Sequence, residues 1–290
     1  MSHIDYLKKE IKKTGYPLEI EISSLLDKKW QFVMNTDTYL DRDEGKLRDI
    51  DIYAFDTLGT EKIAPLGLRA GLVIECKKDE DFAWVFFTRP FKFDIENIAG
   101  QYIDEAQIIT KNVENFQVME IILGKAPLHY KNMKRIAVSY NEFCLKGKKA
   151  SYEKKKREIF EAQNQLKKYI DCGIDQLIKA GSELRMYPIE MSFPCIVFDG
   201  LMYEAIVENG NLQLEEANHL ILDTSYRTPY SVFEKCLLVD VVRKDCFENY
   251  LKLIRKDVML FKRIVSTNSR KITRRIDEII SLLSSTKTRG

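Results

Sequence analysis

Three charged residues stand where an apolar sequence makes charge costly. Glu75 and Lys77 interrupt the apolar run Gly71–Lys77 at alternate positions, so both side chains point to one face of a strand. Asp51 lies between two isoleucines on the preceding strand. Apolar strands are typically buried inside a sheet, where an unpaired charge is expensive. If the two strands pair as antiparallel neighbours, the three charged side chains come together and form a site.

Two carboxylates beside a lysine suit a hard divalent cation such as Mg²⁺ or Mn²⁺, which prefers oxygen ligands and keeps several waters. The expected ligands are Asp51, Glu75 and the backbone carbonyl of Cys76. The metal would acidify a water and polarise a phosphoryl oxygen. Lys77 would orient that water and stabilise the charge growing on the phosphate. Glu19 is expected to hold a second metal or a metal-bound water.

The elements that position these residues follow from hydrophobic periodicity. A helix is predicted over Pro17–Lys29, with Glu19 at one edge of its apolar stripe. Strands are predicted over Trp30–Asn35, with an extension toward Leu40, over Arg48–Phe55 and over Leu68–Lys78, and a turn over Asp41–Gly45. Strict alternation in the second strand places Asp49, Asp51, Tyr53 and Phe55 on one side and Ile50, Ile52 and Ala54 on the other.

The rest of the chain predicts helices and strands in mixed order, which indicates an α/β protein with a mixed central sheet flanked by helices. The further predicted elements are a helix over Ile4–Lys13, a short fourth strand or a strand extension over Trp84–Thr88, a helix over Asp94–Thr110, a strand over Ala137–Tyr140, a long helix over Ser151–Ala180, a hairpin of Cys195–Phe198 and Tyr203–Val207 around Asp199-Gly200, strands over Leu220–Asp223 and Cys236–Val242, and helices over Phe247–Ile264 and Asn268–Ser284.

Asp51 followed by Glu75-Cys76-Lys77 on a hydrophobic strand resembles the D…(D/E)-x-K signature of the PD-(D/E)xK, or restriction-endonuclease-like, nuclease superfamily. The segment Thr-Gly-Tyr-Pro-Leu-Glu at 14–19 resembles the start of the first core helix in Mrr-like members, where a glutamate supports the metal site. The resemblance implies a core of one helix, three strands, a helix and a fourth strand, and it covers residues 14–78. It also implies that Gln163 or Gln165 is an accessory site residue.

The sequence departs from the family pattern at three places. Ile50 stands where the family signature has proline, and the long gap between Asp51 and Glu75 requires an extended loop over 56–69. Asp49 competes with Asp51 for the role of first carboxylate, and the more apolar surroundings favour Asp51. D…E-x-K alone also occurs by chance in charged proteins, so a surface strand with a cross-strand salt bridge is the alternative interpretation.

The densest basic cluster contains the candidate nucleic-acid-binding residues Lys148, Lys149, Lys154, Lys155 and Lys156. These lysines could follow a phosphate backbone. A solvated loop and helix start is the alternative interpretation of the same cluster.

Composition and charge limit the partners and metal sites that are expected. The net charge of +2 is too mild to demand an anionic partner. None of the six cysteines forms a C-x-x-C pair and the histidines, His3, His129 and His219, are isolated, so no structural zinc site is expected and no role is assigned to them. A polar N-terminus, and no apolar run near the roughly 20 residues that span a bilayer, predict a cytoplasmic protein without a membrane partner.

The expected domain organisation is a nuclease-like core over residues 1–200, with an insertion around 91–150, and a C-terminal α+β elaboration over 201–290 packed on the core. The expected function is Mg²⁺- or Mn²⁺-dependent hydrolysis of phosphodiester bonds in nucleic acid, with DNA as the expected substrate. The resemblance implies a role in restriction, defence or repair. The alternatives are a non-catalytic member that binds nucleic acid or protein, and a subunit silent until an activating partner protein binds. The C-terminal part leaves room for such regulation or for a homodimer.

Overall fold

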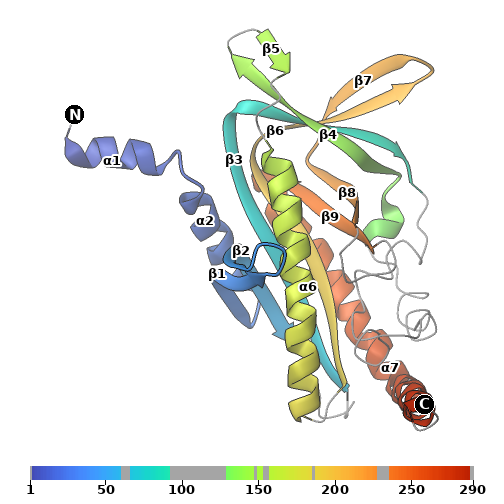
Figure 1. The fold of residues 1–290 in the computed structure, drawn as a ribbon. Coiled ribbons are helices and arrows are strands. Elements are labelled where there is room, and N and C mark those ends of the chain that lie inside the picture. The colour runs from blue at the N-terminus through green and yellow to red at the C-terminus, as the bar shows by residue number, and fades with distance from the viewer. Residues whose placement is uncertain are drawn as a thin grey trace.

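The computed structural model describes residues 2–59, 66–91, 129–146, 149–152, 157–184, 187–226 and 235–287 (Figure 1). In chain order the elements are α1 (His3–Ile11), α2 (Tyr16–Leu26), β1 (Phe32–Asp41), β2 (Lys46–Thr57), β3 (Leu66–Pro90), η1 (His129–Asn132), β4 (Arg135–Lys146), β5 (Lys149–Tyr152), α6 (Glu158–Leu184), β6 (Tyr187–Glu208), β7 (Asn211–Glu216), β8 (His219–Tyr226), β9 (Lys235–Arg243), η2 (Lys244–Cys246) and α7 (Phe247–Lys287). The predicted α/β class with a mixed sheet is therefore confirmed.

Two long parallel strands, β3 and β6, run side by side and organise a sheet of nine strands among the described residues (Figure 1). In their first halves, β3 pairs on its outer edge with β2, and β6 pairs on its outer edge with β9. In their second halves the outer neighbours are β4 and β7. β1 extends the sheet beyond β2, and β8 pairs with both β9 and β4. The first halves of β3 and β6 thus form one set of strands with β2 and β9, and the second halves form another with β4 and β7. The two sets meet at a bend.

The bend lies where the register between β3 and β6 shifts, between Lys78 and Ala83. The carboxylate of Asp79 is buried there and accepts the backbone N–H groups of Asp81 at 2.9 Å and Phe82 at 3.1 Å. On β6 the facing residue is Gly200. A hairpin was predicted around Asp199-Gly200, and that prediction is wrong because β6 continues through the glycine. Gly200 serves the close approach of two strands at the bend, and not a reversal of the chain.

We expect Gly200→Ala to destabilise the fold by about 1–3 kcal/mol, the usual cost of overpacking. A Cβ at this position would lie 2.5 Å from the backbone oxygen of Asp79 and would also overlap the ring of Phe198. Urea unfolding followed by circular dichroism measures the loss. The matched control is Gly173→Ala in α6, where nothing lies within 4 Å of the added Cβ. The control should unfold at the same or a higher urea concentration; equal midpoints for the two variants would contradict the prediction.

Helices cover both faces of the first half of the sheet. α6 lies on one face, where Ile159, Ala162 and Leu166 pack into a core with β3 and β6. α2 and α7 contribute to the core on the other face. Along β3 the side chains alternate between the two cores, so Ile74 points toward α2 and α7 while Val73 points toward α6. Glu75 and Lys77 continue the series that faces α6.

Two helices differ from their predicted bounds. The helix predicted to start at Ser151 starts at Glu158, because residues 149–152 pair with β4 as β5, and the Glu142 carboxylate accepts the Ile159 N–H at 3.1 Å. The two helices predicted at the C-terminal end are one helix, α7, because Ser266 and Thr267 favour a cap in sequence but Val265 and Ile272 keep packing in the core on both sides of them.

Other boundaries shift less. Of the two alternatives for residues 84–88, the strand extension is confirmed, because 68–78 and 84–88 are the two halves of β3. The helix predicted over Asp94–Thr110 lies outside the described residues. Within the described part of the chain, no helix is both long and apolar enough to cross a membrane.

Candidate active site

The first carboxylate sits where β2 leaves β3. The last residue pair between these two strands is Ile52 with Ile74. Asp51 precedes Ile52 on β2, so it lies just beyond the paired part of the strand. Its Oδ2 atom accepts the backbone N–H of Cys76 at 2.7 Å. A side chain therefore replaces the backbone acceptor that a continuing strand would have supplied, and this bond holds the carboxylate over β3.

A strained residue lies opposite Asp51. The β1–β2 pairs on either side place Thr36 in register with Asp51, and Thr36 has φ of +56°. A β-branched residue rarely adopts this left-handed conformation, and such strain tends to occur at functional sites. At this irregularity the side chains of β2 stop alternating regularly between the two faces of the sheet. The predicted strict alternation is wrong at Ile50, which packs with Tyr53 in the core beneath α6 while Ile52 packs on the opposite face.

The second carboxylate, Glu75, is fully buried, with 0% of its surface exposed. Its Oε2 atom lies 2.6 Å from Nζ of Lys77. Among the described residues its Oε1 atom has no hydrogen-bond partner. Burial raises the pKa of Glu75 to about 8, although the ammonium of Lys77 acts in the opposite direction. One oxygen of a buried carboxylate is thus left for a ligand.

Lys77 lies between the two carboxylates. Its Nζ atom is 4.0 Å from Oδ2 of Asp51 and is mostly shielded from solvent. Burial lowers the pKa of Lys77, but the charges of Glu75 and Asp51 outweigh it, so the net pKa is raised and the amine stays protonated. Burial also raises the pKa of Asp51, against the effects of Lys77 and of the Cys76 N–H.

Glu19 reaches the same place from α2. The buried stripe of this helix packs toward the sheet and leaves Glu19 half-buried at its edge. Partial burial raises the pKa of Glu19, the Asp51 charge raises it further, and Lys77 lowers it. Three carboxyl groups with raised pKa values therefore surround one ammonium. Such a cluster carries excess negative charge when ionised, and a divalent cation would relieve it.

The structure thus brings Asp51, Glu75 and Lys77 together, and it places Glu19 within electrostatic range of Asp51 and Lys77. Asp49 is separate, because its exposed carboxylate accepts the Thr38 hydroxyl at 2.7 Å.

Tyr39 on β1 was not considered from sequence. It is buried, and its pKa is raised first by burial and then by the charge of Glu75. No local pattern in β1 marks it, because its neighbours in sequence are ordinary strand residues.

The accessory candidates have a different placement. Gln163 is buried on α6 beside Tyr140 of β4, and among the described residues its amide nitrogen has no hydrogen-bond partner. Gln165 is half-buried on the same helix. The candidate nucleic-acid-binding residues Lys148, Lys154, Lys155 and Lys156 lie outside the described residues, and Lys149 is described only by its backbone in β5.

A second polar cluster was missed. His129 and His219 looked isolated in sequence, but the structure places both beside the buried Asp240. The available signal was Asp240 itself, a carboxylate in the apolar run 237–242.

No family model matches the chain, and neither a curated protein nor a solved structure is significantly similar to it.

Proposed function

We propose that the chain is a metal-dependent nuclease that hydrolyses phosphodiester bonds, with DNA as substrate, through a site made of Asp51, Glu75, Lys77 and Glu19. The observation that carries the proposal is the state of Glu75. It is a fully buried carboxylate beside a protonated lysine and a second carboxylate, and one of its oxygens has no hydrogen-bond partner among the described residues. Folding such a group into a core is costly unless a ligand completes it.

The order of elements supports a restriction-endonuclease-like core. α2, β1, β2 and β3 follow one another as a helix and an antiparallel meander. After η1, β4 and β5, α6 leads to β6, which pairs in parallel with β3. Apart from η1, β4 and β5, this order matches the helix, three strands, helix and strand that the D…E-x-K resemblance implies. Asp51 and Glu75 lie on the second and third strands of the series, as that resemblance requires.

The donor set fits Mg²⁺ or Mn²⁺. Asp51 and Glu75 offer carboxylate oxygens, Glu19 offers a third, and the backbone of Cys76 lies between the two principal ligands. These are hard oxygen donors in a small, partly dry space. When bound, the ion would polarise a phosphoryl oxygen and acidify a water.

The chain's own groups have distinct roles in this proposal. Asp51 and Glu75 hold the cation, and the Cys76 N–H keeps Asp51 in position. Lys77 donates hydrogen bonds to the attacking water or to the non-bridging oxygen that gains charge. Glu19 accepts a hydrogen bond from a water at the edge of the site. Burial beneath α6 strengthens each of these electrostatic interactions.

We expect the purified protein to cut supercoiled plasmid or single-stranded DNA with Mg²⁺ or Mn²⁺ and not with EDTA. Asp51→Asn should reduce cleavage at least about 100-fold, because it removes a charged ligand worth several kcal/mol in the transition state. Asp49→Asn is the matched control, two residues away on the same strand, and should cleave like the wild type. Gel assays of both variants, with calorimetric titration of Mn²⁺, provide the measurement.

The outcomes separate the alternatives. Equal loss in both aspartate variants would contradict the assigned site. Neither cleavage nor metal binding in the wild type would contradict the enzyme proposal and favour a non-catalytic binding module. Metal binding without cleavage, reduced by Asp51→Asn, would identify the site and point to a missing activating partner or another nucleic acid.

A further inference from the structure

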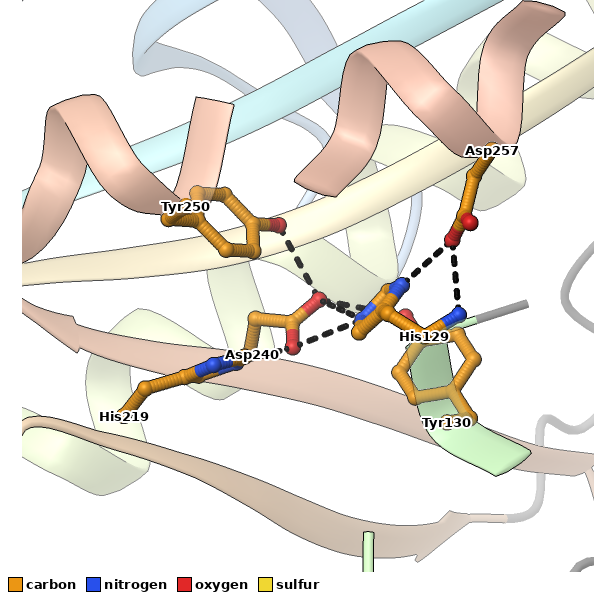
Figure 2. Close-up of polar contacts among 6 residues, drawn as sticks. All are labelled: His129, Tyr130, His219, Asp240, Tyr250 and Asp257. Carbon is orange, nitrogen blue, oxygen red and sulfur yellow. Dashed lines mark hydrogen bonds and ion pairs between the residues drawn. The ribbon is translucent and has the colours of Figure 1, made fainter. Parts of the chain in front are cut away.

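A second group of buried polar side chains lies on the opposite face of the sheet, between β9, β8, η1 and α7. Figure 2 shows imidazole and phenol groups around the carboxylate of Asp240, with Asp257 against His129. Asp240 is completely buried, and His129 is nearly so. His219 keeps 18% of its side chain exposed. The nuclease proposal uses none of these residues.

The two oxygens of Asp240 share one partner, Nε2 of His129, which lies 3.1 Å from Oδ1 and 3.3 Å from Oδ2. Oδ2 accepts hydroxyl groups from Tyr130 at 3.1 Å and from Tyr250 at 3.0 Å. Oδ1 faces two imidazole nitrogens, Nε2 of His129 at 3.1 Å and Nε2 of His219 at 2.7 Å (Figure 2). The tyrosines fix the carboxylate, and both imidazole nitrogens lie beside it.

Asp257 of α7 fixes the ring of His129. Its Oδ2 atom lies 2.6 Å from Nδ1 of the ring and also accepts the backbone N–H of His129 at 2.9 Å (Figure 2). Nδ1 therefore carries a proton that it donates to Asp257, and Nε2 is directed at Asp240. A carboxylate behind the far nitrogen of a histidine is the usual support of a metal-bound imidazole.

We propose that Nε2 of His129, Nε2 of His219 and a carboxylate oxygen of Asp240 bind one divalent transition-metal ion, with Zn²⁺ as the best match. The three ligand atoms all lie within 4.8 Å of one another. Zinc bonds of about 2.0–2.2 Å put neighbouring tetrahedral ligands about 3.3 Å apart, so small shifts of the two rings suffice. Two nitrogen ligands disfavour Mg²⁺ and Ca²⁺, which take oxygen.

The choice of ligands separates this site from the first one. Asp51 and Glu75 offer only oxygen, whereas the second site offers two imidazoles and one carboxylate. A metal here would join η1, β8 and β9, and Asp257 would couple it to α7. The partly exposed His219 provides the side from which an ion enters. The zinc site therefore links the C-terminal helix to the sheet. This proposal does not depend on the nuclease activity.

Without a metal, the same atoms form a network of hydrogen bonds. Burial lowers the pKa of His129, but Asp240 and Asp257 outweigh it and raise the pKa to about 9, so the ring is then an imidazolium. The experiment must therefore distinguish a metal site from a metal-free network. Thermal stability alone cannot do this, because either arrangement stabilises the fold.

The test uses full-length protein carrying Asp51→Asn, which weakens the other cation site, after removal of metal with EDTA. Calorimetric titration with Zn²⁺ should give one ion per chain, and Co²⁺ should give the visible absorption of a four-coordinate site. His219→Gln should weaken Zn²⁺ binding at least 100-fold while its amide still donates to Asp240. Asp257→Asn should weaken it about 10- to 100-fold.

The matched control is His3→Ala, because His3 is exposed on α1. It should bind Zn²⁺ as the parent does. At 100 times the dissociation constant of the parent, Zn²⁺ should raise the melting temperature of the parent by about 5 °C or more, and that of His219→Gln by no more than about 1–2 °C. If the folded parent takes up no Zn²⁺, or if folded His219→Gln binds it as tightly as the parent, the metal site is excluded and the metal-free network stands.

Discussion

Lys77→Met should reduce metal-dependent DNA cleavage by about 100- to 1,000-fold while leaving metal binding at the same order of affinity. The ammonium lies 2.6 Å from Glu75 and 4.0 Å from Asp51, so it faces the position where a phosphate and its attacking water would sit. Removing a positioned donor that stabilises developing charge typically costs this much in the catalytic step. Lys77 is not a metal ligand, so cleavage and binding should separate.

The neighbouring lysine provides a matched control. Lys78 points to the other face of β3, and its Nζ atom donates to the backbone oxygen of Lys12 at 2.9 Å and lies 3.1 Å from Glu80. Lys78→Met should cut plasmid at the wild-type rate. Initial nicking rates measure cleavage, and Mn²⁺ calorimetry measures binding. Wild-type cleavage by Lys77→Met would remove this lysine from the mechanism, and loss of metal binding would show that its role is to hold the site together.

The candidate site could be predicted because its signal is local. Glu75 and Lys77 interrupt an apolar strand two residues apart, and Asp51 is the nearest acidic residue in an equally apolar setting. Antiparallel pairing of consecutive strands then brings them together. Helix α2 follows from its apolar stripe, which also places Glu19. Each of these steps depends on residues close in sequence, where periodicity is most informative.

The long strands could not be predicted in the same way. Asp79 and Gly200 look like turn residues, yet they form the bend shared by β3 and β6. Their role depends on the parallel pairing of segments about 120 residues apart, which no local pattern records. A genuine hairpin signal was missed nearby. Asn209 and Gly210 both have positive φ and join β6 to β7, as expected for an Asn-Gly turn.

The histidine cluster could not be predicted from sequence for a different reason. His129, His219 and Asp240 come from three separate parts of the chain, so their spacing resembles no metal motif. The reasoning applied to Glu75, that a carboxylate in an apolar strand needs a partner, applies equally to Asp240. It predicts that such a partner exists. It does not identify the partner, because the histidines reach Asp240 only through tertiary packing.

The largest stability effect is expected at Glu190, which links three strands on the face that also carries Glu75. Its carboxylate accepts hydroxyl groups from Tyr53 and Ser192, each at 3.0 Å, and the Nε of Arg69 at 2.5 Å. A Cβ on Gly71 would lie 2.6 Å from this carboxylate, so the glycine makes room for the network. Glu190→Ala should cost about 3–5 kcal/mol, because it leaves a largely buried arginine without its partner.

Two comparisons test the cause of that loss. Glu208→Ala removes a glutamate from the same strand that pairs with Arg135 at 3.1 Å, but this glutamate is 61% exposed, so the loss should be about 0–1 kcal/mol. The double variant Arg69→Met/Glu190→Met should recover much of the stability lost in Glu190→Ala, because no charge is then stranded. Urea unfolding of the three variants gives the free energies. A double variant no more stable than Glu190→Ala would place the cost in the lost hydrogen bonds of Tyr53 and Ser192, and not in the unpaired charge of Arg69.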